Sequence, residues 1–363
     1  MKIDGRWRRT IEVDAGGQVI VLDQARLPHA IAWLPLATVD DAARAIRDMH
    51  VRGAPLIGAT AAWGVALALA ADPDGLAAAI AQLAATRPTA INLRWALDAC
   101  ARALAGVPRG DRAAVARATA ARICDDDVAC NQAIGRAGLA LLRDLHARAG
   151  DRPLRVLTHC NAGWVATVDW GTALAPIYMA HEAGLPIEVW VDETRPRNQG
   201  LLTAWELAQH GVPHTLVADN AGGHLMQRGL VDACLVGTDR TTRAGDVCNK
   251  IGTYLKALAA HANRVPFYVA LPSPTIDWTV ADGAAIPIEE RSGDEVRLVA
   301  GKDAAGAPAR VAIVDAATRV ANPAFDVTPA HLVTALVTER GVCPATAAGL
   351  AGLFPERAAE VAP

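Results

Sequence analysis

Leu154-Arg155-Val156-Leu157 runs directly into Thr158-His159-Cys160-Asn161, and this junction of an apolar run with a reactive polar cluster recurs along the second half of the chain. The other junctions are Ile187 to Val191 before Asp192-Glu193-Thr194-Arg195, Thr215 to Ala218 before Asp219-Asn220, Ala233 to Val236 before Gly237-Thr238-Asp239-Arg240, and Phe267 to Leu271 before Pro272-Ser273. Short apolar runs that alternate with helical patterns predict buried strands of a parallel sheet. Because ligands bind beyond the carboxyl ends of such strands, we expect these clusters to converge on one small-molecule site.

Composition narrows the class of protein. The chain has 363 residues, 52% of them hydrophobic, and a formal net charge of -3, which predicts a soluble globular protein with room for two domains. It lacks the basic excess that nucleic-acid binding requires, so no nucleic-acid partner is expected. Seven cysteines without a C-x-x-C pair favour a reduced compartment. The first residues lack the apolar core of a signal peptide, and we expect a cytoplasmic protein.

The stretch from Ala54 to Ala71 carries no charge and is long enough to span a membrane. It is rich in Ala and Gly rather than Leu and Ile, and it lies between Arg52 and Asp72 without an aromatic belt. We therefore expect a buried, closely packed helix and no membrane association.

The remaining patterns predict two domains. Thr10 to Val13 and Val19 to Leu22 flank a turn and indicate a hairpin. Thr38 with Asp41 has the spacing of a capping box, and Pro55 after Gly53 suits the first turn of a helix. Helical patterns then continue to about Ala149. The predicted α/β fold has a small, mostly helical N-terminal domain with a short β element (1–149) and a Rossmann-like C-terminal domain with a parallel sheet (150–363).

Cys160 is the first candidate catalytic residue, because it lies where a predicted strand ends. A thiol that is polarised there by a cation or by backbone N–H groups can exchange a proton or act as a nucleophile. The alternative, a small buried hydrophobe, is the better interpretation for Cys124, Cys130, Cys234 and Cys343. His159 could serve as the base for Cys160, but neighbouring side chains on a strand point in opposite directions, which favours a packing or orienting role for His159.

Asp239 follows a later strand at the equivalent position. A carboxyl group in an apolar pocket stays protonated closer to neutral pH, as a general acid requires. An ordinary ion pair with Arg240 explains the same sequence equally well.

Several groups are suited to an anion. Arg52, Gly53 and Ala54 precede a predicted helix whose free N–H groups an anion can approach, and Arg94 could add further donors. Lys250, in Asn249-Lys250-Ile251-Gly252, is predicted at a helix N-terminus, where its charge opposes the macrodipole unless an anion binds between them. A solvated lysine is the plainer alternative.

A polar loop containing Arg195, Arg197, Asn198 and Gln199 offers donors for sugar hydroxyls or phosphate, although pairing of Arg195 with Asp192 or Glu193 would explain part of it. No spacing of His, Cys and carboxylates matches a zinc site. Neither a Walker loop nor a G-x-G-x-x-G fingerprint, the two common nucleotide-binding motifs, is present. The sequence therefore predicts neither a metal nor a cofactor.

Taken together, these clusters resemble the S-methyl-5-thioribose-1-phosphate isomerase family, which shares a superfamily with the alpha, beta and delta regulatory subunits of the eukaryotic initiation-factor exchange complex. The motifs run nearly end to end: Leu22-Asp23-Gln24 with Leu27-Pro28, Val51 to Pro55, Arg87 to Leu93, Thr158 to Asn161, Asp192 to Pro196, Gly237 to Arg240, Asn249 to Tyr254, Ile286 to Arg291 and Asn322 to Pro329. The departures are Asn198, Thr238, Cys248 and Pro274, where leucine, alanine or serine is common.

The resemblance implies a reaction, a site and an assembly. Family members convert 5-methylthioribose 1-phosphate, an aldose, into 5-methylthioribulose 1-phosphate, a ketose, in methionine salvage, and they are usually homodimers. Asp239 would protonate the ring oxygen, and Cys160 would either shuttle the C2 proton or line a pocket for a hydride shift. The substrate-binding groups would be Arg52, Gly53, Ala54, Arg94, Gln199, Asn249 and Lys250. The alternatives are isomerisation of ribose 1,5-bisphosphate or 5-deoxyribose 1-phosphate, and a non-catalytic regulatory subunit that senses phosphosugars or nucleotides.

Overall fold

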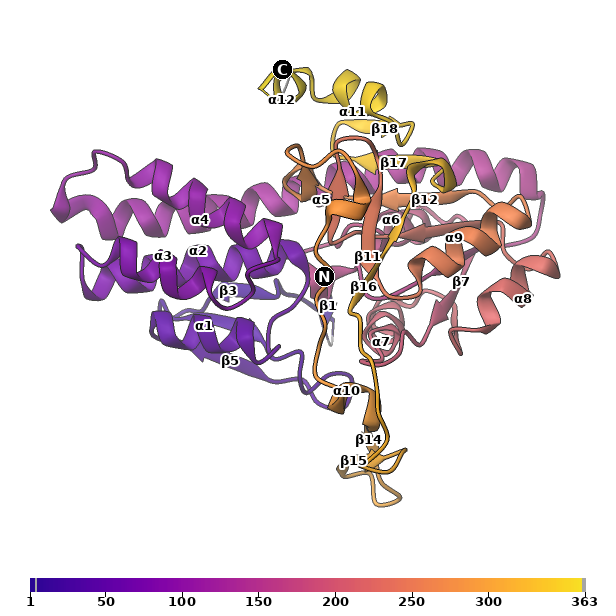
Figure 1. The fold of residues 1–363 in the computed structure, drawn as a ribbon, viewed down its shortest axis with the longest axis horizontal. Helices are drawn as coiled ribbons and strands as arrows, with labels where there is room; N and C mark the ends of the chain where they lie inside the picture. The colour runs from indigo at the N-terminus through magenta and orange to yellow at the C-terminus, as the bar shows by residue number, and fades with distance from the viewer. Residues whose placement is uncertain (4, 361–363) are drawn as a thin grey trace.

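The computed structural model describes residues 1–3 and 5–360. Its N-terminal half consists of short strands followed by helices (Figure 1). The strands are β1 (Lys2–Ile3), β2 (Arg6–Trp7), β3 (Ile11–Val13), β4 (Val19–Leu22) and β5 (Trp33–Leu36), and the helices are α1 (Val39–Arg47), α2 (Ala54–Ala71), α3 (Leu76–Ala84), α4 (Ile91–Leu104) and α5 (Arg112–Ala149). The expected hairpin is confirmed, because β3 pairs antiparallel with β4, which also pairs with β5.

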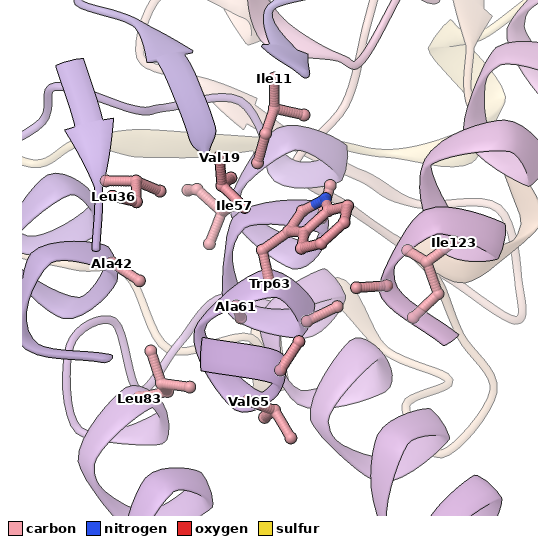
Figure 2. Packing of buried hydrophobic residues seen from close by; sticks show 14 of the residues in the cluster. Ile11, Val19, Leu36, Ala42, Ile57, Ala61, Trp63, Val65, Leu83 and Ile123 are labelled. Atoms are coloured by element: carbon pink, nitrogen blue, oxygen red, sulfur yellow. The ribbon is translucent and has the colours of Figure 1, made fainter. Parts of the chain in front are cut away.

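Helix α2 forms the centre of the N-terminal core. It is apolar on all sides, and α1, α3, α4 and α5 pack around it. Figure 2 shows Trp63 of α2 between Ile11 and Val19 of the small sheet on one side and Ile123 of α5 on the other. By length and composition α2 could cross a membrane, but 72% of it is buried inside the protein. The prediction of a buried, closely packed helix is confirmed.

The predicted start of α1 is also confirmed. The backbone N–H of Asp41 donates to Thr38 Oγ1 (3.2 Å), and the backbone N–H of Thr38 donates to Asp41 Oδ2 (3.0 Å). This reciprocal pair satisfies donors that the first helical turn leaves free.

The C-terminal half contains a seven-stranded sheet with the order β18-β17-β12-β9-β6-β7-β8. Six of its strands are parallel, and β18 pairs antiparallel at one edge. These strands are β6 (Leu154–Thr158), β7 (Ile187–Asp192), β8 (His214–Val217), β9 (Ala233–Val236), β12 (Phe267–Ala270), β17 (Ala335–Thr338) and β18 (Gly341–Cys343). The order of the parallel strands is that of the Rossmann fold, whose direction of winding reverses between β6 and β9. All five strands predicted from the apolar runs are present.

Helices cover both faces of this sheet, because side chains alternate along each strand. Val156 and Leu235 pack in one core with residues of α5 and α6, whereas Leu157 and Val236 pack in another with residues of α8 and α9. The helices of this half are α6 (Leu174–Glu182), α7 (Gly200–His210), α8 (Ala221–Gln227), α9 (Thr253–Ala262), α10 (Asp294–Arg297), α11 (Ala347–Leu353) and α12 (Pro355–Glu360).

A second sheet lies beyond the ends of the parallel strands, with the order β13-β10-β11-β16. Its strands are β10 (Arg240–Thr242), β11 (Val247–Lys250), β13 (Ile276–Asp277) and β16 (Phe325–Thr328). A hairpin of β14 (Leu298–Lys302) and β15 (Pro308–Ala312) projects away from the body of the molecule (Figure 1). The sequence predicted neither feature.

Helix α5 joins the two halves. Ala116 and Ile123, in its first part, belong to the N-terminal core, whereas Ile134 and Leu142, in its second part, pack against the large sheet. The chain leaves this helix at Gly150 and enters β6 at Leu154. The division of the sequence near Gly150 stays a prediction.

Candidate active site

A cavity lies between the carboxyl ends of β6 and β9 and the N-terminus of α2, and both sequence-predicted catalytic residues line it. Cys160 follows β6 and Asp239 follows β9, the two strands between which the winding of the sheet reverses. The cavity has about 1150 Å³ of empty space when its open mouth is included, so it is open to solvent on one side. Residues far apart in sequence therefore meet at one place, as the strand-end argument predicts.

Cys160 is held in an uncommon backbone conformation at the end of β6. Its φ is 66°, in the left-handed region that few residues other than glycine adopt. Its N–H donates to Thr194 Oγ1 (2.8 Å), and its carbonyl accepts from Thr203 Oγ1 (2.8 Å). Burial raises the pKa of the thiol, while the nearby Lys250 and Arg52 act in the opposite direction. The thiol thus lines the cavity beside two cations.

His159 does not act on Cys160. Its Nδ1 lies 2.9 Å from Asp192 Oδ2, its Nε2 lies 2.9 Å from the carbonyl oxygen of Ile251, and the side chain is buried. Lys256 Nζ approaches the same Asp192 oxygen at 3.2 Å. The imidazole therefore ties β6, β7 and the turn after β11 together, in agreement with its expected orienting role.

Asp239 presents its carboxyl group to the cavity. Its backbone N–H bonds to the carbonyl of Cys248 (3.0 Å), but its side chain has neither an ion pair nor a hydrogen bond with any residue that the structure describes. Burial raises the pKa of Asp239, opposed by Lys250, Arg87 and Arg52. Arg240 pairs with Asp277 (3.3 Å) instead, so the alternative of an Asp239–Arg240 pair is wrong.

Arg52, Gly53 and Ala54 line the cavity at the start of α2. Arg52 Nη2 donates to Asn161 Oδ1 (2.9 Å), and burial lowers the pKa of the guanidinium to about 10. Gly53 has a φ of 93°, and a Cβ there would lie 2.2 Å from the carbonyl oxygen of Ala166. Glycine is therefore required for the first turn of α2 to approach the loop that follows Cys160.

Lys250 and Asn249 enter the cavity from β11, not from a helix N-terminus. The prediction that Lys250 lies at a helix N-terminus is wrong by a few residues, because α9 begins at Thr253 after Gly252 takes a φ of 99°. Lys250 Nζ donates to the carbonyl of Ala324 (3.0 Å) and lies 4.6 Å from the centre of the Phe325 ring. Burial lowers the pKa of Lys250, whereas Cys160 and Asp239 raise it.

Gln199 also lines the cavity, from the turn before α7, and is buried. Arg197 lies beside it and pairs with Glu295 (2.8 Å). Arg195 turns away and donates to the carbonyl oxygens of Pro196 (2.9 Å) and Val296 (3.0 Å). Only part of the predicted polar loop therefore faces the site, and pairing of Arg195 with Asp192 or Glu193 is not observed.

The structure does not bring Arg94 to the cavity. Arg94 lies on the exposed side of α4, where it pairs with Asp98 (3.1 Å), one helical turn further on. The arginine of the same motif that lines the cavity is Arg87, just before α4, which pairs with Glu289 (3.1 Å). The predicted placement of Arg94 in the site is therefore wrong, and Arg87 lines the cavity in its stead. Arg87 lies before α4 and Arg94 lies within its first turn, so the position of the helix boundary distinguishes them.

Two of the cationic side chains that line the cavity differ from the others in having no carboxylate partner in the described part of the chain. Arg52 and Lys250 have no carboxylate within ion-pair distance among the described residues. Each of the other cationic residues that line the cavity forms an ion pair; these are Arg87 with Glu289, Arg197 with Glu295, Arg240 with Asp277, and Arg291 with Glu289 and Glu295. Arg52 and Lys250 are thus the pair of charges left to attract an anion.

Among the described residues, one group of potential metal ligands occurs, and it includes His159 next to Cys160. Atoms of His159, Asp192 and Asp219 lie within 4.8 Å of one another. The ammonium of Lys256 already contacts Asp192 and donates to the carbonyl of Asp219. A lysine thus supplies the positive charge at this position, and the donor set does not fit a metal ion well.

The arrangement combines a thiol, a free carboxyl group and two unneutralised cations in one recess, with apolar side chains such as Met49, Ile57 and Phe325 on its walls. A carboxyl group with a raised pKa can donate a proton, and the cations can hold a phosphate. The site is therefore suited to proton transfer on a small phosphorylated substrate.

Comparison with known proteins agrees with this geometry. The family model of the initiation factor 2 subunit family matches residues 50–345. The chain belongs to this family. A Rhodospirillum rubrum protein named methylthioribose-1-phosphate isomerase is 63% identical over 368 residues, which cover 99% of this chain and 94% of that protein. The family resemblance read from the motifs is confirmed.

Two solved structures of the family superpose over nearly the whole chain. The 5-methylthioribose 1-phosphate isomerase of Pyrococcus horikoshii OT3 gives a TM-score of 0.83 with 37% identity and covers 97% of each chain. A protein from A. fulgidus described as translation initiation factor eIF-2B, subunit delta, gives a TM-score of 0.81 with 38% identity, covering 96% of this chain and 100% of that one. The predicted fold, a helical N-terminal domain with a Rossmann-like C-terminal domain, is confirmed.

Proposed function

We propose that this protein is an aldose–ketose isomerase that converts 5-methylthioribose 1-phosphate into 5-methylthioribulose 1-phosphate in methionine salvage. The observation that carries the proposal is the sequence identity of 63–64%, over nearly the whole chain, with relatives named for this reaction. It is supported by a cavity at the switch point of the sheet that holds the Cys160 thiol and the Asp239 carboxyl group together.

The charges of the cavity favour a substrate with a single phosphate. Arg52 and Lys250, with the N–H groups at the start of α2, can bind one phosphate group. The remaining cations are paired with carboxylates, and the walls include Met49, Ile57 and Phe325. A second phosphate, as in ribose 1,5-bisphosphate, would have to displace one of these ion pairs. A methylthio group would contact an apolar wall, which favours the methylthio sugar.

The chemistry follows from a substrate whose anomeric oxygen carries phosphate, so that the ring cannot open to a free aldehyde. Asp239 donates its proton to the ring oxygen while the bond from C1 to that oxygen breaks. The hydrogen on C2 then moves to C1, and the C2 hydroxyl passes its proton to the Asp239 carboxylate, which leaves the ketone and restores the acid. Gln199 and Asn249 line the same cavity and can bind the sugar hydroxyls.

The hydrogen on C2 can reach C1 by two routes, as a proton or as a hydride. In one, the Cys160 thiolate removes the proton from C2, an enol forms, and the thiol returns the proton to C1. In the other, the hydrogen moves as a hydride with its electron pair, and Cys160 only lines the pocket. Running the reaction in heavy water separates the routes. Deuterium at C1 of the ketose supports the proton shuttle, and its complete absence contradicts it.

The substrate is tested by assaying the purified protein on 5-methylthioribose 1-phosphate, ribose 1,5-bisphosphate and 5-deoxyribose 1-phosphate, following ketose formation. We expect the highest kcat/KM on the methylthio sugar. A bisphosphate preference would contradict the charge argument, and lack of turnover on all three would favour a regulatory subunit, as the name of the A. fulgidus relative suggests. The free carboxyl group of Asp239 beside Cys160 supports the enzyme, because a sensor of phosphosugars requires neither.

We further propose that the protein acts in the cytoplasm as a homodimer, without a metal, cofactor or nucleic-acid partner. The assembly is tested by analytical ultracentrifugation, in which a mass twice that of the 37.9 kDa chain is expected. A monomer at micromolar concentration would reject it.

A further inference from the structure

Glu206, on α7, is buried beneath the catalytic loop and forms four hydrogen bonds there. Its Oε1 accepts from Asn161 Nδ2 (2.6 Å) and from the backbone N–H of Val165 (3.1 Å). Its Oε2 accepts from the backbone N–H of Trp164 (2.6 Å) and from the Tyr178 hydroxyl (2.9 Å). The side chain is inaccessible to solvent, so Glu206 does not touch a substrate.

The packing around Glu206 is built for a carboxylate. Four donors converge on its two oxygens, and three of them, the Asn161 amide and the N–H groups of Trp164 and Val165, can only donate, whereas the Tyr178 hydroxyl can also accept. Burial raises the pKa of Glu206, and the four donors oppose this effect. A Cβ on Gly163 would lie 2.2 Å from Glu206 Oε2, so glycine at this position makes room for the carboxylate.

Glu206 determines which way the Asn161 amide faces. Asn161 Nδ2 donates to Glu206 and also to Thr203 Oγ1 (3.1 Å), so its NH₂ group points toward α7. The Oδ1 atom then points to the cavity side, where it accepts from Arg52 Nη2 (2.9 Å). If the amide turned over, it would present N–H groups to a guanidinium, which has donors only.

We propose that Glu206 is a positioning residue for phosphate binding, which acts through Asn161 to aim the Arg52 guanidinium into the cavity. This inference rests on the proposed function, since it gives Arg52 the task of binding the substrate phosphate. Arg52 has no carboxylate partner among the described residues, so the link through Asn161 is the side-chain contact that fixes its guanidinium.

Glu206→Gln tests the link at constant size. A glutamine keeps one acceptor oxygen and presents an NH₂ group in place of the other, so either the loop N–H of Trp164 or the amide of Asn161 faces a donor. We expect KM to rise about tenfold, as for loss of a hydrogen bond to a charged group, with kcat changed far less. Asn161→Ala, which removes the link and leaves Glu206 intact, should raise KM similarly.

Tyr178→Phe is the matched control. It removes one of the four donors to Glu206 without touching Asn161, so KM should stay as in the wild type even if the melting temperature falls. Arg52→Ala supplies a second check. Glu206→Gln should raise KM little further in the Arg52→Ala background, because coupled residues are not additive. A full tenfold increase on that background, or a Tyr178→Phe enzyme as impaired as Glu206→Gln, would show a merely structural role.

Binding of inorganic phosphate, measured by calorimetry on the same proteins, separates this inference from the proposed function. Weaker phosphate binding by Glu206→Gln together with a wild type inactive on the methylthio sugar would sustain the positioning role and reject the substrate. An active wild type whose Glu206→Gln variant keeps its KM and its affinity for phosphate would reject the positioning role alone. Melting curves verify that each variant is folded.

Discussion

At the scale of single residues, the site depends on charged side chains that have no ion-pair partner among the described residues, namely Asp239, Arg52 and Lys250. Cys160 and Asp239 could be predicted because each directly follows an apolar strand, and the ends of parallel strands meet. Arg87 could not be distinguished from Arg94 in the same way. Its position depends on an ion pair with Glu289, 202 residues further along the chain, and on where α4 begins. Neither can be read from local sequence.

Asp239→Asn tests the general acid. An amide cannot donate the proton at comparable acidity, so we expect kcat to fall by about two to four orders of magnitude. In the wild type, a raised pKa keeps Asp239 protonated to higher pH than an ordinary carboxyl group, and activity should fall as pH rises through that pKa. A pH profile of kcat checks the sign, and this limb should be absent from any residual activity of Asp239→Asn. Near-full turnover by the variant would rule out the assigned role.

Arg87→Ala and Arg94→Ala form a matched pair in one motif. Arg87 lines the cavity and its ion pair with Glu289 joins the two parts of the protein that form it, so its removal should raise KM about tenfold. Arg94 lies on the exposed side of α4 in a surface ion pair, which contributes little, so its removal should leave both kcat and KM unchanged. Steady-state kinetics on both variants measures the two effects. A raised KM for Arg94→Ala with an unchanged KM for Arg87→Ala would contradict the structure and place Arg94 in the site.

At the scale of elements, regular secondary structure was predicted where the pattern is local. The capping box of α1, the apolar helix α2 and the five strands of the parallel sheet all follow from residues close in sequence. The sheet formed by β10, β11, β13 and β16 was missed because its strands are short and two of its three pairings are distant. Val247, for example, pairs with Thr328. That sheet carries Asn249 and Lys250, and because β11 was not predicted, Lys250 was expected at the N-terminus of the helix that follows.

Gly53→Ala tests the contact between α2 and the catalytic loop. The new Cβ would overlap the carbonyl of Ala166 and also disfavour the φ of 93°, so we expect the start of α2 to move away from the loop. Activity should fall at least tenfold. Gly106→Ala is the control, since Gly106 has a φ of 73° with no atom within 4 Å of a Cβ, and it should lower only stability, by about 1 kcal/mol. Equal effects of both variants on kcat/KM would contradict the contact argument.

At the scale of the whole molecule, the cavity lies where the N-terminal helices meet the Rossmann-like sheet, and both parts supply its charges. Arg52 and Arg87 come from the N-terminal part, whereas Lys250 and Asp239 come from the C-terminal part. The Arg87–Glu289 ion pair crosses between them. A bound phosphate would contact both parts at once and should therefore stabilise the assembled protein more than either part alone.

This stabilisation can be measured without a substrate. A ligand that binds only the folded protein raises the free energy of unfolding by about 2.7 kcal/mol at 100 times its Kd. We therefore expect inorganic phosphate to raise the melting temperature by a few degrees, with the increase growing with the logarithm of its concentration. Lys250→Met should lose most of this increase, because it removes one of the two cations that lack a carboxylate partner. Lys302→Met, on the projecting β14–β15 hairpin, should keep it. Sulfate-free buffers with and without phosphate, at equal ionic strength, separate binding at the site from general salt effects. An equal loss of the increase in both lysine variants would place the phosphate elsewhere.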